Sequence, residues 1–177
     1  MRKPWQTIST KTILKTPWVE YKHDRFYLPS KKVGDYYYTS TNDSVLIVPV
    51  LKDKKLILVK QFRYLMKKYS IEFPMGGIKN NQTPLSAAKA ELEEEAGYRA
   101  KKFKKLGWFN PFNGCTNEVC HVFLAKDLEK TKQKLDKTED ILVLVQSVRE
   151  LGKMIKLNRI WDGQSLAAWS LVKRFIM

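Results

Sequence analysis

The chain has 177 residues, of which 44% are hydrophobic and 12% aromatic. This composition excludes an intrinsically disordered chain, which lacks the apolar side chains needed to offset the entropy cost of ordering. The 33 Lys and Arg residues exceed the 18 Asp and Glu residues, so the formal charge at pH 7 is +15. The charge indicates an anionic partner, which can be nucleic acid, nucleotide phosphates or an acidic membrane surface, or it reflects only a lysine-rich surface.

Cysteine content and apolar runs predict the compartment. Cys115 and Cys120 are the only cysteines, so the sequence has no disulfide framework and favours a reducing environment. The longest apolar run, 45–51, is far shorter than the roughly 20 residues of a transmembrane helix. The basic N-terminus lacks the apolar core of a secretory signal. We therefore expect a cytoplasmic protein with no membrane partner.

The first half of the chain predicts strands. Residues 1–43 are aromatic and β-prone, and prolines and Gly34 interrupt them, which is typical of short strands and turns. The apolar runs 44–51 and 56–64 are separated by the polar segment 52–55. This pattern predicts a β-hairpin in a buried sheet.

A helix is predicted after the short strand 71–74 and a loop rich in Gly and Asn. Thr83 is a typical N-cap, and Pro84 suits the first helical position, where its missing N–H costs nothing. The helix should end at Ala96, because Gly97 is a favourable residue just beyond a helix. At 100° per residue, one apolar stripe is expected, made of Leu85, Ala88, Leu92 and Ala96.

The remaining segments complete a mixed domain. Strands are predicted at 101–112, 118–128 and 137–148, a short helix at 148–155 and a terminal helix at 165–175. This order indicates a β-rich domain with a few helices packed on it.

The segment 90–98 contains an unusual acidic cluster. Glu91, Glu94 and Glu95 are spaced i, i+3 and i+4, which brings three carboxylates onto one face of a helix. Like charges this close destabilise a helix unless solvent, a basic neighbour or a bound cation compensates for them. Hard divalent cations prefer such oxygen ligands. A solvated acidic face is the alternative.

The residues from Gly76 onward, GGIKNNQTPLSAAKAELEEEAGY, resemble the signature of the Nudix hydrolase family. That signature is Gly, five residues, Glu, seven residues, then Arg-Glu-apolar-x-Glu-Glu-x-Gly-apolar. The matching positions are Gly76, Glu91, Leu92, Glu94, Glu95, Gly97 and Tyr98. Gln82 replaces the first Glu and Ala90 replaces the Arg. These departures put one outer metal contact and the orientation of the helix carboxylates in doubt.

The flanking segments LVKQFRY, IEFPMGG and NPFNGCTNEVCHVFLAKDL look like the ADP-ribose pyrophosphatase branch of that family. The resemblance implies an α/β fold, a Nudix-type α/β/α sandwich with a mixed β-sheet. It assigns 44–177 to the hydrolase domain and 1–43 to an N-terminal β region that builds a homodimer.

The resemblance also implies a reaction. The protein would hydrolyse ADP-ribose or a related nucleoside diphosphate sugar to AMP and a sugar phosphate, by attack of water assisted by Mg²⁺ or Mn²⁺. Because Ala90 and Gln82 depart from the signature and the charge is +15, the alternative is a degenerate domain that binds nucleotide or RNA without efficient hydrolysis. Nucleic acid is thus the less favoured partner, behind a nucleotide sugar.

Roles for individual residues follow from the same resemblance. The metal ligands would be Glu91, Glu94, Glu95 and the carbonyl of Met75. Glu94 and Glu139 are the candidate catalytic residues, and Glu139 is preferred as the base over the neighbouring acids of the loop 136–140. The alternative for that loop is a charged turn before a strand.

Four further residues are candidate substrate contacts. Arg63 is an Arg in a lysine-dominated chain at a predicted strand end, which suits a phosphate clamp, although a surface charge is the alternative. Glu72 contacts substrate or forms a salt bridge at the edge of the core. Gly76 and Gly77 begin the signature and would line the substrate.

Overall fold

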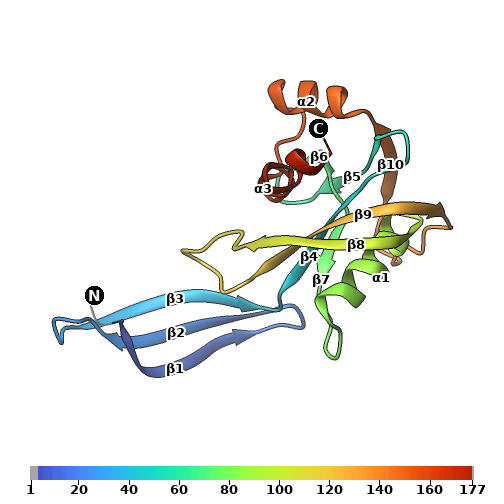
Figure 1. The fold of residues 1–177 in the computed structure, drawn as a ribbon. Coiled ribbons are helices and arrows are strands. Elements are labelled where there is room, and N and C mark those ends of the chain that lie inside the picture. The colour runs from blue at the N-terminus through green and yellow to red at the C-terminus, as the bar shows by residue number, and fades with distance from the viewer. Residues whose placement is uncertain (1–3, 177) are drawn as a thin grey trace. The chain divides into compact units, whose positions relative to one another are not determined.

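A computed structural model describes residues 4–176 (Figure 1). The chain divides into two compact units. The smaller unit comprises the described part of residues 1–43 together with Asn110–Val119. The larger unit comprises Ser44–Phe109 and the described part of residues 120–177.

The smaller unit is an antiparallel sheet of order β1-β2-β3. Its strands are β1 (Gln6–Lys15), β2 (Val19–Tyr27) and β3 (Val33–Thr41). The segment 110–119 lies against β3, because Thr39 N–H donates to the Cys115 carbonyl at 2.8 Å and the Tyr36 hydroxyl donates to the Gly114 carbonyl at 2.8 Å. The predicted strands of 1–43 are therefore present, and a loop from the middle of the chain packs with them.

The larger unit contains two sheets. One is the four-stranded sheet β7-β4-β9-β8 and the other is the three-stranded sheet β10-β5-β6. The strands are β4 (Ser44–Pro49), β5 (Leu56–Arg63), β6 (Lys68–Glu72), β7 (Met75–Gly77), β8 (Tyr98–Phe109), β9 (Cys120–Lys130) and β10 (Ile141–Gln146). Only β4 and β9 pair in parallel, so the four-stranded sheet is mixed.

The predicted hairpin at 44–64 is wrong. Its two runs form β4 and β5, but these strands belong to different sheets and are joined only by a single bridge between Val50 and Leu56. Strand β4 instead pairs with β7 and β9, which come from distant parts of the sequence. Long-range partners occupy both edges of β4, so the local pairing is not made.

Helices cover both faces of the four-stranded sheet. They are α1 (Pro84–Ala96), α2 (Val148–Lys156) and α3 (Gly163–Val172), and a 3₁₀ turn η1 (Lys173–Phe175) follows. Along β4, Val45 and Ile47 pack in one hydrophobic cluster with α1, whereas Leu46 and Val48 pack in the other with α2 and α3. This alternation buries both faces of β4 and gives the expected α/β/α sandwich (Figure 1).

The buried face of α1 differs from the predicted stripe: Leu85 is not part of it, whereas Ala87 and Glu95 are. Leu85 shares the angular position of Leu92 but is 41% exposed, so the first turn extends beyond the packed layer. The buried residues of α1 are Ala87, Ala88, Leu92, Glu95 and Ala96. Three alanines let the helix approach the sheet closely, and this approach also buries Glu95, a carboxylate.

Candidate active site

Local sequence fixes the ends of α1 as predicted. The Thr83 hydroxyl accepts the Ser86 N–H, and the Ser86 hydroxyl accepts the Thr83 N–H, which forms a capping box ahead of Pro84. Gly97 has a φ of 66°, in the left-handed region that ends helices. The acidic residues of α1 are therefore held on a helix with defined ends.

The segment before β10 holds the end of α1. Gln133 donates from Nε2 to the Glu95 carbonyl at 2.7 Å and to the Ile141 carbonyl at 3.1 Å. The Lys134 N–H donates to the Glu94 carbonyl at 3.0 Å. These bonds satisfy carbonyls that a helix end leaves unpaired. They also fix the start of the acidic loop 136–140 against the helix.

Glu95 is buried beside β7. It is 6% exposed, and its Oε2 accepts the Met75 N–H at 3.0 Å. Burial raises the pKa of Glu95 to about 8, and the nearby Glu91 carboxylate adds to that rise, while the Met75 hydrogen bond opposes it. A carboxyl with this pKa retains its proton near neutral pH unless a cation compensates for its charge.

Glu91 is in a similar state one turn earlier on the same face. Burial raises its pKa to about 7, with further contributions from Glu94 and Glu139, whereas Lys79 lowers it. A Cβ on Gly76 would overlap the Glu91 carboxyl group. The glycine therefore leaves room for this carboxyl against β7, and a larger residue would displace it.

Cations near the helix are distributed unevenly. Arg99 forms two hydrogen bonds with Glu93 at 2.7 and 2.8 Å, and Lys134 contacts Glu93 at 2.7 Å. These partners hold the pKa of Glu93 at about 2. Glu93 is therefore compensated by basic side chains, in contrast to Glu91 and Glu95.

Lys79 is a functional candidate that the sequence analysis missed. Its Nζ lies 4.0 Å from Glu94 Oε2, and its charge lowers the pKa of Glu91. The Lys79 N–H donates to Gln82 Oε1 at 2.9 Å, so the residue that replaces the family glutamate holds the loop that carries this lysine. The sequence signal that could have identified Lys79 is its position as a basic residue in the loop just before the helix.

Arg63 and Glu72 meet in the three-stranded sheet. Glu72 is 1% exposed, and Arg63 Nε donates to its Oε1 at 2.8 Å while Nη2 contacts Oε2. Gln61 adds a bond to Glu72 at 3.3 Å. Glu72 thus forms the salt bridge that was the alternative to a substrate contact. Arg63 directs its guanidinium to this partner, and its side chain is 37% exposed.

Glu139 lies in an exposed loop within electrostatic reach of the buried carboxylates. Its Oε2 accepts the Asp136 N–H at 3.0 Å, and its N–H donates to the Asp136 carbonyl at 3.0 Å. Its charge helps to raise the pKa of both Glu91 and Glu95. The loop therefore brings a solvent-accessible carboxylate toward the helix face that was predicted to hold metal.

The acidic residues suit a hard cation in chemistry but do not form a closed set of ligands. Within residues 4–176, no three Asp, Glu, His or Cys side chains form a group that could hold a metal ion. Glu95 is nonetheless a buried and Glu91 a partly buried oxygen donor, and neither has a basic partner as close as those of Glu93, which is the environment that a divalent cation would stabilise. No helix in the same range is long and apolar enough to cross a membrane.

Comparison with known proteins identifies the family. The sequence profile of the NUDIX domain matches residues 40–168. The chain belongs to the Nudix hydrolase family. It is 32% identical over 143 residues to the ADP-ribose pyrophosphatase of Bacillus subtilis (strain 168), covering 80% of this chain and 77% of that protein.

Two other Nudix comparisons show the breadth of the similarity. The methanol dehydrogenase activator of Bacillus methanolicus is 27% identical over 165 residues, covering 92% of this chain and 89% of that protein. A crystal structure of an ADP compounds hydrolase superposes with a TM-score of 0.88 over 99% of this chain and 95% of its own, at 19% identity, and confirms the fold. This Nudix protein lies in the ADP-ribose pyrophosphatase branch and is a hydrolase of the pyrophosphatase class.

The close approach of Gly76 to Glu91 gives a first prediction. A Gly76→Ala substitution should lower the free energy of unfolding by up to about 1 kcal/mol, because the new methyl group overlaps the Glu91 carboxyl and must displace this flexible end of the side chain. Urea denaturation measures this change. The matched control is Gly77→Ala, whose Cβ would meet nothing within 4 Å. Equal effects of the two substitutions would contradict the proposed contact.

The raised pKa values give a second prediction, for the metal-free protein. Glu91 and Glu95 bind protons more tightly in the folded than in the unfolded chain, so stability should fall as pH rises from about 4.5 to 8. The loss from Glu91 alone should be about 3 kcal/mol. Urea denaturation in EDTA across this range tests it.

The control for the pH dependence lies on the same helix. Glu95→Gln should reduce the decline of stability with pH to the part that comes from Glu91. Glu93→Gln should leave the decline in place, because the pKa of Glu93 is already low and its charge is paired with Arg99 and Lys134. A stability that rises over this pH range in the unsubstituted protein would contradict the assigned pKa shifts.

Proposed function

We propose that this Nudix hydrolase cleaves ADP-ribose or a related nucleoside diphosphate sugar into AMP and a sugar phosphate, using Mg²⁺ or Mn²⁺. The observation that carries the proposal is the pair of carboxylates on the signature helix, buried Glu95 and partly buried Glu91, which basic side chains do not compensate as they do Glu93. The similarity to an ADP-ribose pyrophosphatase supports the substrate class.

Glu91 and Glu95 are the proposed principal metal ligands, with Glu94 as a third ligand or outer partner. The Met75 carbonyl is a further candidate, since the N–H of the same residue already contacts Glu95. When bound, a divalent cation neutralises the charge that develops on the phosphates. Ligation requires both buried carboxyls to lose their protons, so metal binding should release protons below about pH 8.

Glu139 is the proposed general base. Its loop is tied to α1 through Gln133 and Lys134, which keeps the Glu139 carboxylate near the helix face while leaving it exposed to water. A general base must receive a proton from the attacking water, and an exposed carboxylate can do so. Glu94, which is partly exposed, is the second candidate for a catalytic role.

The proposed substrate contacts are two glycines of β7 and the Arg63–Glu72 pair of the three-stranded sheet. Gly76 and Gly77 offer a surface without side chains, which suits close approach of phosphates. Arg63 is a candidate phosphate contact and Glu72 its support, because the buried Glu72 carboxylate orients the guanidinium. In this role Glu72 acts through Arg63.

A third prediction tests the enzyme and its residues. With Mg²⁺, the protein should release AMP from ADP-ribose, and EDTA should abolish the release. Glu95→Gln and Glu139→Gln should each lower kcat by at least about 100-fold, as expected for loss of a ligand or a base. Glu93→Gln, which alters the opposite face of α1, is the matched control and should retain activity.

The same assay separates hydrolysis from binding alone. A panel of nucleoside diphosphate compounds identifies the preferred substrate through AMP or nucleotide release. Nucleotide binding without turnover of any compound would overturn the proposed reaction and favour the non-hydrolysing alternative.

A homodimer through the N-terminal β region is also proposed. Every residue of β1 is exposed, and large apolar side chains on and beside it face solvent, among them Leu14 at 60% and Trp18 at 80% exposure. The two hydrophobic clusters of the chain contain no described residue of 1–43. A second copy that covers this sheet would remove the apolar surface from water.

A fourth prediction concerns this assembly. The unsubstituted protein should have the mass of two chains in light scattering after size exclusion. A Leu14→Lys/Trp18→Lys double variant should shift to the mass of one chain. The control Leu65→Lys/Leu157→Lys changes two side chains of the larger unit that are 91% and 63% exposed, and it should stay dimeric. A monomeric unsubstituted protein would contradict the proposal.

A cytoplasmic location is also proposed, because the structure contains a free cysteine thiol. Cys115 is a free thiol on the surface. Free thiols persist in a reducing compartment, so this state is compatible with the cytoplasm.

A further inference from the structure

A pocket of about 410 Å³ lies in the larger unit, away from the acidic helix. Its apolar lining includes Val50 and Ile176, which belong to the hydrophobic cluster on the α2 and α3 side of the sheet. Helix α1 packs in the other cluster. The pocket and the buried carboxylates are therefore on opposite faces of the four-stranded sheet.

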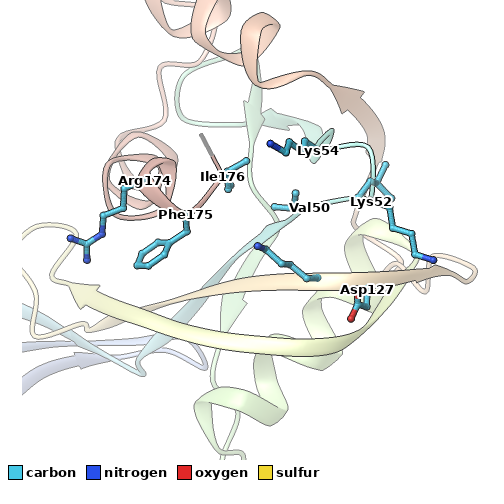
Figure 2. A pocket seen from close by; sticks show the side chains of 9 residues that line it. Val50, Lys52, Lys54, Asp127, Arg174, Phe175 and Ile176 are labelled. Atoms are coloured by element: carbon cyan, nitrogen blue, oxygen red, sulfur yellow. The ribbon is translucent and has the colours of Figure 1, made fainter.

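Basic side chains dominate the rim of this pocket. Figure 2 shows Arg174, Phe175 and Ile176 on one side and the β4–β5 turn with Lys52 and Lys54 on the other. Lys126 of β9 also lines it. Within the described chain, none of the four basic residues forms a salt bridge, although the Asp127 carboxylate lies within electrostatic reach of Lys52. Asp127 binds Lys102 at 2.8 Å, and Asp53 binds Lys55 at 2.8 Å.

The backbone at the pocket is held in an unfavourable conformation at two positions. Lys54 has a φ of 61° and Asp127 a φ of 56°, in the left-handed region that side chains other than glycine rarely adopt. The turn is closed by hydrogen bonds from Leu51 N–H to the Lys55 carbonyl at 2.8 Å and from Lys54 N–H to the Leu51 carbonyl at 3.0 Å.

The charged region continues beyond the pocket. Lys104 lies over the Phe175 ring at 4.4 Å from its centroid, and the Arg174 guanidinium lies at 4.9 Å from the same centroid. A second hollow on β8 and β9 shares Lys126 and is lined also by Lys101, Lys102 and Lys104. The cations thus extend over a surface wide enough for more than one anionic group.

We propose that this pocket is a second anion site, which binds a phosphate oligoanion, either a free polyphosphate group or the phosphates of a single-stranded nucleic acid. The four basic side chains form no salt bridge among the described residues and outnumber Asp127, the one carboxylate in the lining. They therefore repel one another, and an anion with several negative charges would relieve that repulsion. Three of the four are lysines, which bind phosphate as point charges without the fixed geometry of arginine. The site differs from the proposed catalytic centre in place and in sign of charge, so it does not depend on the proposed function.

Two probes test the site in the full chain, in EDTA so that no metal supports binding at the acidic helix. One is inorganic tripolyphosphate and the other is a twelve-residue oligothymidylate, each titrated by calorimetry at several salt concentrations. Lys54→Gln/Lys126→Gln should weaken binding of at least one probe by tenfold or more, since each lysine supplies a charged contact. For the oligothymidylate, the salt slope should fall by about 1.4.

The matched control is Lys130→Gln/Lys156→Gln. It removes the same two charges from the end of β9 and the end of α2, outside the pocket. The control should bind both probes as the unsubstituted protein does. Binding of tripolyphosphate alone would identify a free polyphosphate as the ligand, and binding of the oligonucleotide alone would identify a nucleic acid strand.

Two results would overturn the proposal. One is that neither probe binds at low salt. The other is that the pocket and control variants lose affinity equally, because the binding would then follow net charge rather than the pocket. Thermal melting of both variants verifies that a loss of affinity does not come from unfolding.

Discussion

The enclosure of Glu95 and, in part, of Glu91 between α1 and β7 is the constraint on which the site depends. Removing two carboxylates from water is costly, and their mutual repulsion adds to the cost, so their pKa values rise to about 7 and 8. The fold maintains this state by close packing. Alanines bring α1 to the sheet, Gly76 leaves room for the Glu91 carboxyl, and the Met75 N–H binds Glu95.

The remaining charges of the helix are arranged so that only one face is left uncompensated. Glu93 forms salt bridges with both Arg99 and Lys134. On the face that contains Glu91 and Glu95, the nearby cation is Lys79, whose Nζ lies 4.0 Å from Glu94 Oε2. The family signature has an Arg where this chain has Ala90. Lys79 and the Gln82 that holds its loop therefore give this protein a different local balance of charge, supplied from the loop before the helix instead of from the helix itself.

The lysines of the larger unit differ in whether they form a salt bridge with a carboxylate. Many lysines pair locally with carboxylates, as Lys101 does with Glu129 and Lys102 with Asp127. Those around the pocket at the β4–β5 turn have no such partners among the described residues, and they lie on the opposite side of the sheet from α1. The two faces of the four-stranded sheet thus differ in the sign of their charge. Carboxylates that favour a cation lie on one face, and basic side chains that favour an anion lie on the other.

The sequence alone determined the local features and the family. The limits of α1, its capping residues and the spacing of Glu91, Glu94 and Glu95 follow from short-range rules and were predicted, as was the sandwich through the family signature. Tertiary structure decided the rest. The partners of β4, the exposure of Leu85, the Arg63–Glu72 pair and the burial of Glu95 depend on segments far apart in the chain. Residue spacing fixes which side chains share a face, but only long-range packing fixes which of those faces lose contact with water.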